Sequence, residues 1–360
     1  MTDNNKMRIV VGLSGGVDSS AAASLLVDQG YDVVGITLKV WPQDCVSRAE
    51  DKCCGPQAVM DARSVADKLD IPYYLVDESK EFQRDVIDYF ATEYKAGRTP
   101  NPCVMCNEKL KFGNLIDRAR KLGAEYVATG HYARLEQRDG RTLLLRGRDV
   151  RKDQTYFLFS LGQEQLAHMM FPLGELQKIE TRKVARCVNL KTAEKQESQE
   201  ICFVPDKDYK KFLTTSGLVE EHRGEIVDTR GQVLGHHDGI EFYTIGQRKG
   251  LGISAPTPMY VIELDPENNR VVVGGEELLL RDEFRIDRCN WIAFDRLAKP
   301  IEASAAIRYN HPGTEATVIP GENGQATVKL REPQRAVTPG QACVFYQDDL
   351  VVGGGWIMRN

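Results

Sequence analysis

The stretch that decides the fold is MRIVVGLSGGVDSSAAASLLVDQG, residues 7–30. It begins with a β-branched apolar run at residues 9–11, which is typical of a buried parallel strand. A Ser- and Gly-rich segment follows, and after it apolar residues recur at helical spacing up to Gly30, where a helix C-terminus usually ends. The stretch therefore predicts a strand, a tight glycine turn and a helix.

Such a turn favours an anion, usually phosphate, because backbone N–H groups and the positive end of the helix dipole meet there. No Lys follows the glycines, so this is not the Lys-dependent P-loop, and the spacing does not match the dinucleotide fingerprint. The turn instead offers hydroxyls on Ser14 and Ser19 and the carboxylate of Asp18. A carboxylate beside phosphates normally implies Mg²⁺ between them.

The whole string resembles the SGGxDS loop of the ATP pyrophosphatases. Those enzymes cleave ATP between the α and β phosphates and pass AMP to a substrate oxygen. The resemblance implies ATP and Mg²⁺ at this turn. The alternative is a Gly-rich turn that binds no ligand.

The length and composition predict a multidomain intracellular protein. A chain of 360 residues can form two or three domains with sizeable cores. Nine cysteines, an odd number, indicate reduced thiols in a cytoplasmic setting. No apolar run is long enough to span a membrane, and the N-terminus has no signal-peptide pattern. The net charge of −5 argues against a general nucleic-acid binder, although it allows a local basic patch.

Strands and helices alternate after the first helix. Strands are expected at residues 31–38, 72–76 and 125–129, and helices at residues 57–69, 82–94 and 181–189. This alternation predicts a doubly wound parallel sheet. Since a nucleotide lies across the carboxyl ends of such strands, Leu38 and Trp41 are candidates to contact the adenine, with plain core packing as the alternative for both.

Cysteines mark two loops. Residues 42–56 form a polar loop with Cys45, Cys53 and Cys54, interpreted as a surface loop rather than a metal clip. Residues 97–107, GRTPNPCVMCN, present Cys103 and Cys106 at an expected helix start, where a thiol has a lowered pKa and is more nucleophilic. The basic residues that follow form either a solvated face or a surface for a polyanion.

The middle of the chain carries the most basic segment. His131 follows a strand end with Gly130, although a structural role is the simpler interpretation of a lone His. Residues 134–147 predict a β-hairpin about Asp139-Gly140, followed by basic residues and the aromatic segment 155–157. Basic residues beside aromatic ones suit an RNA contact, and a solvated hairpin is the alternative.

Two further cysteines differ in their surroundings. Cys187 lies on the expected helix 181–189, where buried packing is predicted. Cys202 lies in the polar segment 195–203, where a functional thiol is favoured. The pair His236-His237 points to opposite faces of a strand, so no metal site is predicted there. From Met259 onward, short strands with turn signals predict a small antiparallel β-barrel or sandwich.

Several motifs in this order resemble the tRNA-specific 2-thiouridylases, the MnmA/TrmU family. They are SGGVDSS, TPNPCVMCN, TGHYA, KDQTYFL, ESQEICF and YTIGQRKGLG. The resemblance implies an α/β pyrophosphatase-type domain at residues 1–208, a small linking domain at 209–275 and a C-terminal β-barrel at 276–360 that helps to grip tRNA. It also implies sulfuration of carbon 2 of the wobble uridine 34 in the tRNAs for Lys, Glu and Gln.

The resemblance also implies roles for individual residues. Cys106 would be the nucleophile and Cys202 would carry a persulfide. ATP would be bound by Gly12, Leu13, Ser14, Gly15, Gly16, Val17, Asp18, Ser19, Leu38 and Gly130. The target base would contact Asn101, Pro102 and Cys103, and tRNA would contact His131, Lys152, Asp153, Gln154, Arg308, Tyr309 and Gln341.

These roles agree with the chemistry. The uracil 2-oxygen is a poor leaving group, and adenylation by ATP-Mg²⁺ converts it into an AMP ester. The persulfide on Cys202 then delivers sulfur, either by direct attack with Cys106 resolving the disulfide, or after Cys106 has released hydrosulfide. The persulfide sulfur would come from a sulfur-relay protein or a cysteine desulfurase.

One position departs from the family pattern. Many members carry Asp at the position of Cys103, where a carboxylate has been proposed as a base. With Cys here, the three thiolates of Cys103, Cys106 and Cys202 could instead hold a [4Fe–4S] cluster. Two other functions are alternatives: a pyrophosphatase-loop synthetase or amidotransferase acting on a small molecule, and a non-catalytic RNA- or metal-binding protein. The basic hairpin and the Cys pair argue against the first, and the intact Asp18 argues against the second.

Overall fold

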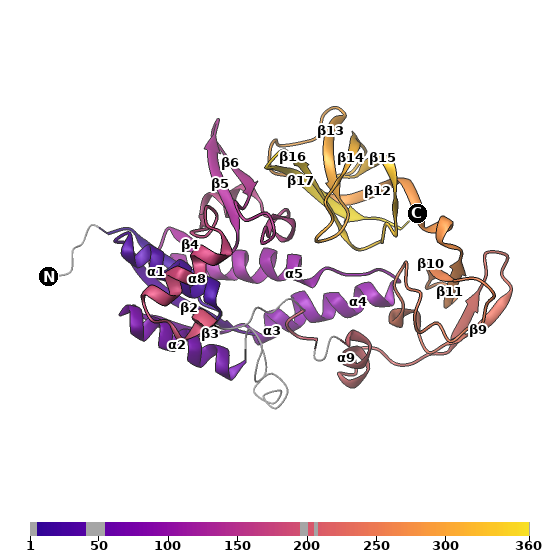
Figure 1. Cartoon of the computed structure of the whole chain (residues 1–360), viewed down its shortest axis with the longest axis horizontal. Helices are drawn as coiled ribbons and strands as arrows, with labels where there is room; N and C mark the ends of the chain where they lie inside the picture. The colour runs from indigo at the N-terminus through magenta and orange to yellow at the C-terminus, as the bar shows by residue number, and fades with distance from the viewer. Residues whose placement is uncertain (1–5, 41–54, 195–200, 205–207, 360) are drawn as a thin grey trace. The chain divides into compact units, whose positions relative to one another are not determined.

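The computed structural model describes residues 6–40, 55–194, 201–204 and 208–359 of the chain. These residues divide into two compact units. The first comprises residues 1–86, 103–207 and 349–351, and the second comprises residues 87–102, 208–348 and 352–360. Figure 1 shows both units and labels helices and strands where there is room. No helix in the described ranges is long and apolar enough to cross a bilayer.

The first unit is built on a five-stranded sheet in the order β3-β2-β1-β4-β7, and every pair in it is parallel. Its strands are β1 (Arg8–Gly12), β2 (Asp32–Lys39), β3 (Tyr73–Asp77), β4 (Tyr126–Ala128) and β7 (Met169–Met170). β1 is central, and its residues 9–11 are fully buried. The predicted parallel sheet is thus confirmed by its strand pairing, and the buried β-branched residues of β1 are typical of a strand covered on both faces.

Helices cover this sheet. They are α1 (Val17–Asp28), α2 (Pro56–Leu69), α6 (Leu115–Lys121), α7 (Gln163–Ala167) and α8 (Lys178–Cys187), with short turns η4 (Thr155–Phe157) and η5 (Lys191–Glu194). Small residues of α1 pack at zero exposure against the apolar core of the sheet and α2. The predicted hairpin is present as β5 (Ala133–Arg138) and β6 (Arg141–Arg146), with Asp139 and Gly140 both at positive φ, as a tight hairpin turn requires.

The helix expected at residues 82–94 is not a single regular helix. It consists of α3 (Ser79–Phe82), a wider π-helical segment η2 (Gln83–Asp88) and α4 (Tyr89–Lys95). A second π-helical segment, η3 (Cys106–Asn114), follows α5 (Pro102–Met105) and leads into α6. Hydrophobic spacing predicts a helical face but does not distinguish these hydrogen-bond patterns. π-Helical turns occur often at functional sites.

The second unit contains two β-structures. A four-stranded sheet in the order β10-β11-β8-β9 is formed by β8 (Gly224–Val227), β9 (Val233–His237), β10 (Tyr260–Asp265) and β11 (Arg270–Gly274). The expectation that all strands from Met259 onward form one antiparallel barrel is therefore wrong. β10 and β11 join the preceding sheet, and β11 pairs with β8 in parallel. The short helical elements beside this sheet are α9 (Tyr209–Thr215), η7 (Ile240–Phe242) and η8 (Glu276–Leu279).

The remaining strands form the predicted C-terminal barrel. They run in the order β12-β15-β14-β13-β16-β17, and β12 also pairs with β17, which closes the ring. The strands are β12 (Leu280–Trp291), β13 (Ile301–Ala306), β14 (Thr314–Pro320), β15 (Ala326–Arg335), β16 (Ala342–Gln347) and β17 (Leu350–Ile357). Their inward-facing residues make a separate core that includes Phe284, Val318 and Phe345. Closure leaves the barrel strands without open edges.

Candidate functional site

The glycine turn between β1 and α1 leads into a helix whose first turn has no side-chain cap. The N–H of Ser14 donates to Ser19 Oγ at 3.1 Å, and the two hydroxyl oxygens of these residues also lie 3.1 Å apart. Gly16 precedes the helix, and no side chain caps the N–H groups of its first turn. Uncapped N–H groups at the positive end of a helix dipole are a ready binding site for phosphate.

Two glycines allow the turn to pack closely against its neighbours. Gly15 has a φ of +68°, and a Cβ there would lie 2.3 Å from the carbonyl oxygen of Ala58 on α2. Gly130, just beyond β4, would place a Cβ 2.6 Å from the backbone of both Asp18 and Ser19. The structure thus brings Gly130 to the turn, as expected for residues at the carboxyl ends of neighbouring parallel strands.

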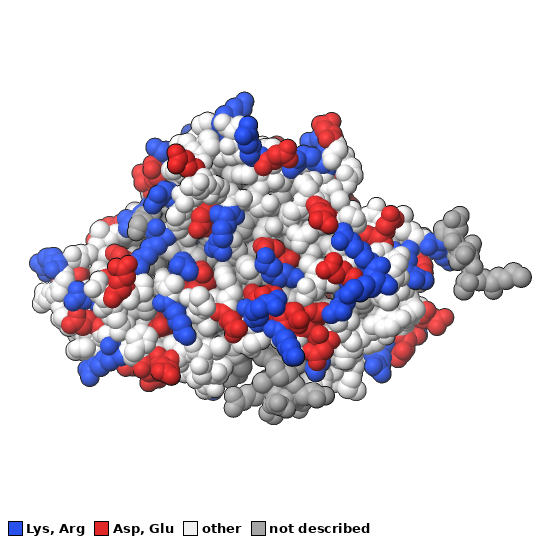
Figure 2. Space-filling view, turned by 180° about the vertical axis from the view of Figure 1, so that it is seen from behind, with Lys and Arg blue, Asp and Glu red and all other residues white. Residues whose placement is uncertain are grey.

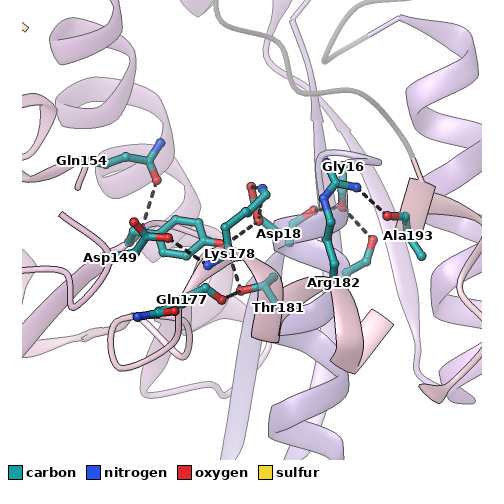
Figure 3. Close-up of polar contacts among 12 residues, drawn as sticks. Gly16, Asp18, Asp149, Gln154, Gln177, Lys178, Thr181, Arg182 and Ala193 are labelled. Atoms are coloured by element: carbon teal, nitrogen blue, oxygen red, sulfur yellow. Dashed lines mark hydrogen bonds and ion pairs between the residues drawn. The ribbon is translucent and has the colours of Figure 1, made fainter. Parts of the chain in front are cut away.

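Asp18 is the centre of a polar network shown in Figure 3. Lys178, the first residue of α8, places its ammonium 2.7 and 2.8 Å from the two carboxylate oxygens of Asp18. The hydroxyl of Tyr132 donates to Asp18 Oδ1 at 2.9 Å and lies 2.9 Å from Thr181 Oγ1. The ammonium also lies 5.6 Å from the centre of the Tyr132 ring, where a cation is attracted to the π-face.

Lys178, Tyr132 and Thr181 are site residues that the sequence did not predict. Tyr132 lies within the TGHYA motif, which is the signal that could have identified it. Lys178 is about 160 residues from Asp18 in the chain, and nothing in its local sequence distinguishes it from a solvated surface Lys. Its backbone N–H donates to Asp149 Oδ2 at 2.9 Å, which fixes the start of α8 beside the turn.

The donor set of this turn fits ATP and Mg²⁺. Asp18 supplies one carboxylate, and Mg²⁺ at phosphates is commonly held by one or two carboxylates together with phosphate oxygens. Lys178 adds a cation beside the same carboxylate. Leu38 is partly exposed near the carboxyl end of β2, where an adenine would lie. Trp41 and the cysteines at 45, 53 and 54 lie outside the described residues.

Cys103, Cys106 and Cys202 all belong to the first unit and are present as thiols. Cys103 is exposed on α5, Cys106 begins η3 and is half-buried, and Cys202 is half-buried. The helical start expected for the CxxC is confirmed. Beside Cys106, the amide of Asn107 donates to the carbonyl of Phe157 at 3.0 Å and ties η3 to the KDQTYFL segment.

The three thiols do not form a cluster site as they are arranged. Within the described ranges, no three side chains of His, Cys, Asp or Glu gather closely enough to hold a metal ion. A [4Fe–4S] cluster would need three thiolates at one point. The residues therefore do not fit this group, and no chemical step is derived through it.

Several residues expected to contact tRNA are buried in the first unit. The Nδ1 atom of His131 is hydrogen-bonded to Thr129 Oγ1 at 2.8 Å, and the imidazole ring lies against the rings of Phe112 and Phe171. Burial, with a smaller contribution from Lys111, lowers the His131 pKa well below its usual value. The imidazole is therefore neutral and packed, and it supports the turn that carries Gly130.

The KDQ segment is held by its own polar groups. Asp153 is buried and accepts hydrogen bonds from the N–H of Gly147 at 3.0 Å and the hydroxyl of Thr155 at 2.7 Å. Burial raises the Asp153 pKa. Gln154 Oε1 accepts from the N–H of Tyr132 at 3.0 Å. The segment is thus anchored to the TGHYA motif, and the exposed cation beside it is Arg151.

One expectation is wrong: Cys187 is exposed rather than buried, because it lies on the solvent side at the end of α8. Of the aromatic residues behind the hairpin, Tyr156 is only 3% exposed, so its ring is not available to stack on a base, whereas Phe157 is half-buried. On the basic helix, Arg118 pairs with the buried Glu78 and Arg120 pairs with Glu164, which favours the structural over the polyanion interpretation.

In the second unit, Gln341 lies at the loop that carries Asn101. Its Nε2 donates to the carbonyls of Thr99 at 3.0 Å and Pro100 at 3.2 Å. Asn101 itself is buried, with 8% of its surface exposed. Arg308 donates to the carbonyl of Arg335, and Tyr309 is exposed beyond β13. Gln341 is therefore placed to fix the loop before the CxxC.

The surface is electrostatically mixed rather than uniformly basic. Figure 2 shows Lys and Arg side chains interspersed with Asp and Glu side chains on one face. This pattern agrees with the net charge of −5. Binding of a polyanion must therefore depend on local groups of cations and backbone donors.

The parallel sheet, the uncapped glycine turn and Asp18 define an ATP-pyrophosphatase-type nucleotide-binding domain joined to two β-structures. Three protein-family profiles match along the chain. A tRNA methyl transferase HUP domain matches residues 7–206, a tRNA methyl transferase PRC-barrel domain matches residues 210–275, and an aminomethyltransferase beta-barrel domain matches residues 281–357.

Three bacterial proteins that share one name are similar to this chain over nearly its whole length. The tRNA-specific 2-thiouridylase MnmA of Clostridium perfringens is 49% identical over 98% of this chain and 98% of its own length. The proteins of the same name from Moorella thermoacetica and Geobacter metallireducens are each 50% identical, over 97% and 99% of this chain and 98% of their own lengths. The chain belongs to the tRNA-specific 2-thiouridylase family, and it is an enzyme of the tRNA sulfurtransferase class.

Proposed function

We propose that this protein uses ATP to convert uridine 34, at the wobble position of the tRNAs for Lys, Glu and Gln, to 2-thiouridine in the cytoplasm. The observation that carries the proposal is the joint presence, in one unit, of an uncapped phosphate turn with Asp18 and of the Cys106 and Cys202 thiols. Activation of an oxygen and delivery of sulfur are the two tasks that such a reaction requires.

The first step is activation of the uracil 2-oxygen. This oxygen attacks the α-phosphorus of ATP, the bond to the β-phosphate breaks, and pyrophosphate leaves. The turn from Gly12 to Ser19 would bind the phosphates, with Leu38 and Gly130 at the adenosine. When bound at Asp18, Mg²⁺ would supply charge neutralisation for the phosphates. Lys178 would balance the charge of the departing pyrophosphate.

The second step is delivery of sulfur. The terminal sulfur of a persulfide on Cys202 attacks carbon 2, and the C–O bond breaks with loss of AMP. The Cys106 thiolate then attacks Cys202 Sγ and forms a Cys106–Cys202 disulfide. The bond from Cys202 Sγ to the transferred sulfur breaks, and this sulfur stays on carbon 2 as the sulfur of 2-thiouridine. The transferred sulfur is reduced while two thiols are oxidised, so each turnover requires a thiol reductant. A cysteine desulfurase or a sulfur-relay protein would supply the persulfide.

The residues assigned to RNA would divide into a contacting group and a positioning group. Asn101, Pro102 and Cys103 would face the target base, and Gln341 would support them through its contacts to Thr99 and Pro100. Lys152, Arg308 and Tyr309 would contact the tRNA. His131, Asp153 and Gln154 would act by positioning, because each side chain is held by a hydrogen bond within the first unit. We place the domain boundaries at residues 208 and 275.

The test is a single-turnover assay with the full chain, ATP-Mg²⁺, unmodified tRNA for Glu and a persulfide source. Nucleoside analysis measures 2-thiouridine, and a coupled assay measures pyrophosphate. Cys106→Ser and Cys202→Ser are expected to release pyrophosphate but to form no 2-thiouridine. Cys187→Ser is the matched control, because Cys187 is an exposed thiol of the same unit.

The outcomes separate the alternatives. Retention of 2-thiouridine in either Cys106→Ser or Cys202→Ser would contradict the two-thiol route. Pyrophosphate release that does not depend on tRNA, with no 2-thiouridine formed by the wild type, would instead indicate a small-molecule substrate.

A further inference from the structure

The loop at residues 246–253, within the YTIGQRKGLG motif and just beyond it, has an unusual backbone. Gly250 and Gly252 have φ values of +73° and +66°, while Lys249 and Leu251 have φ on the ordinary negative side. Residues that alternate between the two handed conformations direct successive backbone N–H groups towards the same side. Such a concavity of N–H groups is called a nest, and nests bind anions.

Most N–H groups of this loop have no acceptor in the described ranges. Residues 249–250 form a turn that directs the Leu251 N–H towards the Arg248 carbonyl, whereas the amides of Arg248, Lys249, Gly250 and Gly252 form no hydrogen bond there. The amides just before them are all used, since Gly246 donates to Val261 O at 2.8 Å and Gln247 donates to Thr244 O at 3.0 Å. These exposed donors are open to water or to an anion, because no group of the protein occupies them.

The loop is held in its conformation from inside. Leu251 is 5% exposed and anchors the loop in the core of the second unit. The Gln247 side chain braces the loop, because its Oε1 accepts from the N–H of Thr244 at 3.2 Å and its Nε2 donates to Lys249 O at 3.0 Å. The donors are therefore preorganised and do not have to be ordered when a ligand arrives.

Positive charge is added at the same place. Arg248 and Lys249 are exposed, and no carboxylate in the described part of the chain pairs with either. By contrast, Arg230 and Arg270 in the same sheet region are paired with Asp228 and Glu225. Arg248, Gly250 and Gly252 also line a hollow of about 260 Å³, which is open to an incoming group.

We infer that the loop at residues 246–253 is an oxyanion site that takes a phosphate of the RNA backbone. The inference rests on the proposed function only in that the anion belongs to the tRNA substrate. Phosphate contacts of this kind position an RNA without reading its sequence. The loop would therefore contribute affinity and salt dependence but no choice among tRNAs. Free phosphate has the same chemistry, and the experiment distinguishes the two sources.

The first measurement is equilibrium binding of unmodified tRNA to the full-length protein at several salt concentrations, without ATP or a sulfur source. Arg248→Ala is expected to weaken binding about five- to tenfold at low salt and to lower the slope of log Kd against log salt by about one. Arg230→Ala is the matched control, because it removes an exposed Arg of the same sheet region whose charge is already paired. It is expected to leave the slope unchanged.

A second pair of variants tests the backbone without changing any charge. Gly252→Ala and Gly231→Ala both place a Cβ at positive φ, and a Cβ at either position meets no atom within 4 Å. The two should strain the fold alike. Only Gly252→Ala is expected to weaken tRNA binding, by about three- to tenfold. Equal weakening by both would show a general effect on folding and would overturn the inference.

The source of the phosphate is tested with glycine-labelled protein. An RNA oligonucleotide is expected to shift the amide resonances of Gly250 and Gly252. If inorganic phosphate shifts them while Arg248→Ala and Gly252→Ala bind tRNA as the wild type does, the site takes free phosphate and the RNA assignment is wrong. Wild-type protein that does not bind tRNA would contradict the proposed function itself, which keeps the two failures apart.

Discussion

Removal of the ammonium at Asp18 is the most informative perturbation of the nucleotide site. In Lys178→Met the aliphatic chain is kept and the charge is lost. Lys178 and Asp18 are 13% and 31% exposed at their side chains, and the ammonium donates to both carboxylate oxygens at 2.7 and 2.8 Å. Asp18 would then keep the Tyr132 hydroxyl as its described partner.

The magnitude follows from the geometry. At an effective dielectric constant of about 20, two unit charges about 3 Å apart attract by about 5 kcal/mol. Desolvation of both groups and ordering of the long side chain cancel most of this attraction. The expected net coupling is therefore about 1–2 kcal/mol, and Lys178→Met is expected to lower the free energy of unfolding by a similar amount.

The assay is a double-mutant cycle with Lys178→Met, Asp18→Asn and the double variant. Urea unfolding gives the coupling free energy, and tRNA-dependent pyrophosphate release gives the catalytic effect. Each single variant is expected to lower the rate of pyrophosphate release by at least about 100-fold, since each removes a charge beside the phosphates. Lys183→Met, also on α8, is the control.

A coupling free energy near zero would refute the reasoning about the ion pair. A Lys178→Met variant with the wild-type rate of pyrophosphate release would refute the catalytic part. The two readouts are independent, because stability is measured without ATP.

Three further predictions concern other parts of the first unit. Gly130→Ala is expected to lose nearly all pyrophosphate release, because its Cβ would lie 2.6 Å from the backbone of Asp18 and Ser19, whereas Gly123→Ala, where a Cβ meets nothing within 4 Å, should retain it. The free energy of unfolding is expected to fall as the pH drops below about 6.5, because burial lowers the His131 pKa in the folded state and protons then bind preferentially to the unfolded chain. Urea unfolding at several pH values measures this dependence, and His131→Phe should flatten it. An unchanged slope in His131→Phe would contradict the assignment of the pH dependence to His131. Asn107→Leu is expected to slow 2-thiouridine formation more than pyrophosphate release. The reason is that the Asn107 amide holds the start of η3, where Cys106 lies, against Phe157. Equal slowing of both reactions would indicate a general structural role for Asn107.

Local pattern determined much of the fold. The apolar run at residues 9–11, the glycines after it and the helical spacing up to Asp28 depend only on neighbours in the chain, and they gave the strand, turn and helix within a residue or two. The Asp139-Gly140 pair gave the hairpin for the same reason, since both residues must adopt positive φ. The assignment of β10 and β11 failed, because strand pairing depends on partners distant in sequence.

The site divides in the same way. The sequence alone determined that residues 12–19 form a phosphate-type turn with a carboxylate, because the glycines, the hydroxyls and Asp18 are contiguous. It also indicated which thiols lie in polar segments. Only the tertiary structure decided that Lys178 is the partner of Asp18, that His131 and Asp153 are buried supports and that Cys187 is exposed. Burial and ion pairing depend on which segments distant in the sequence pack together, and local sequence patterns do not specify those segments.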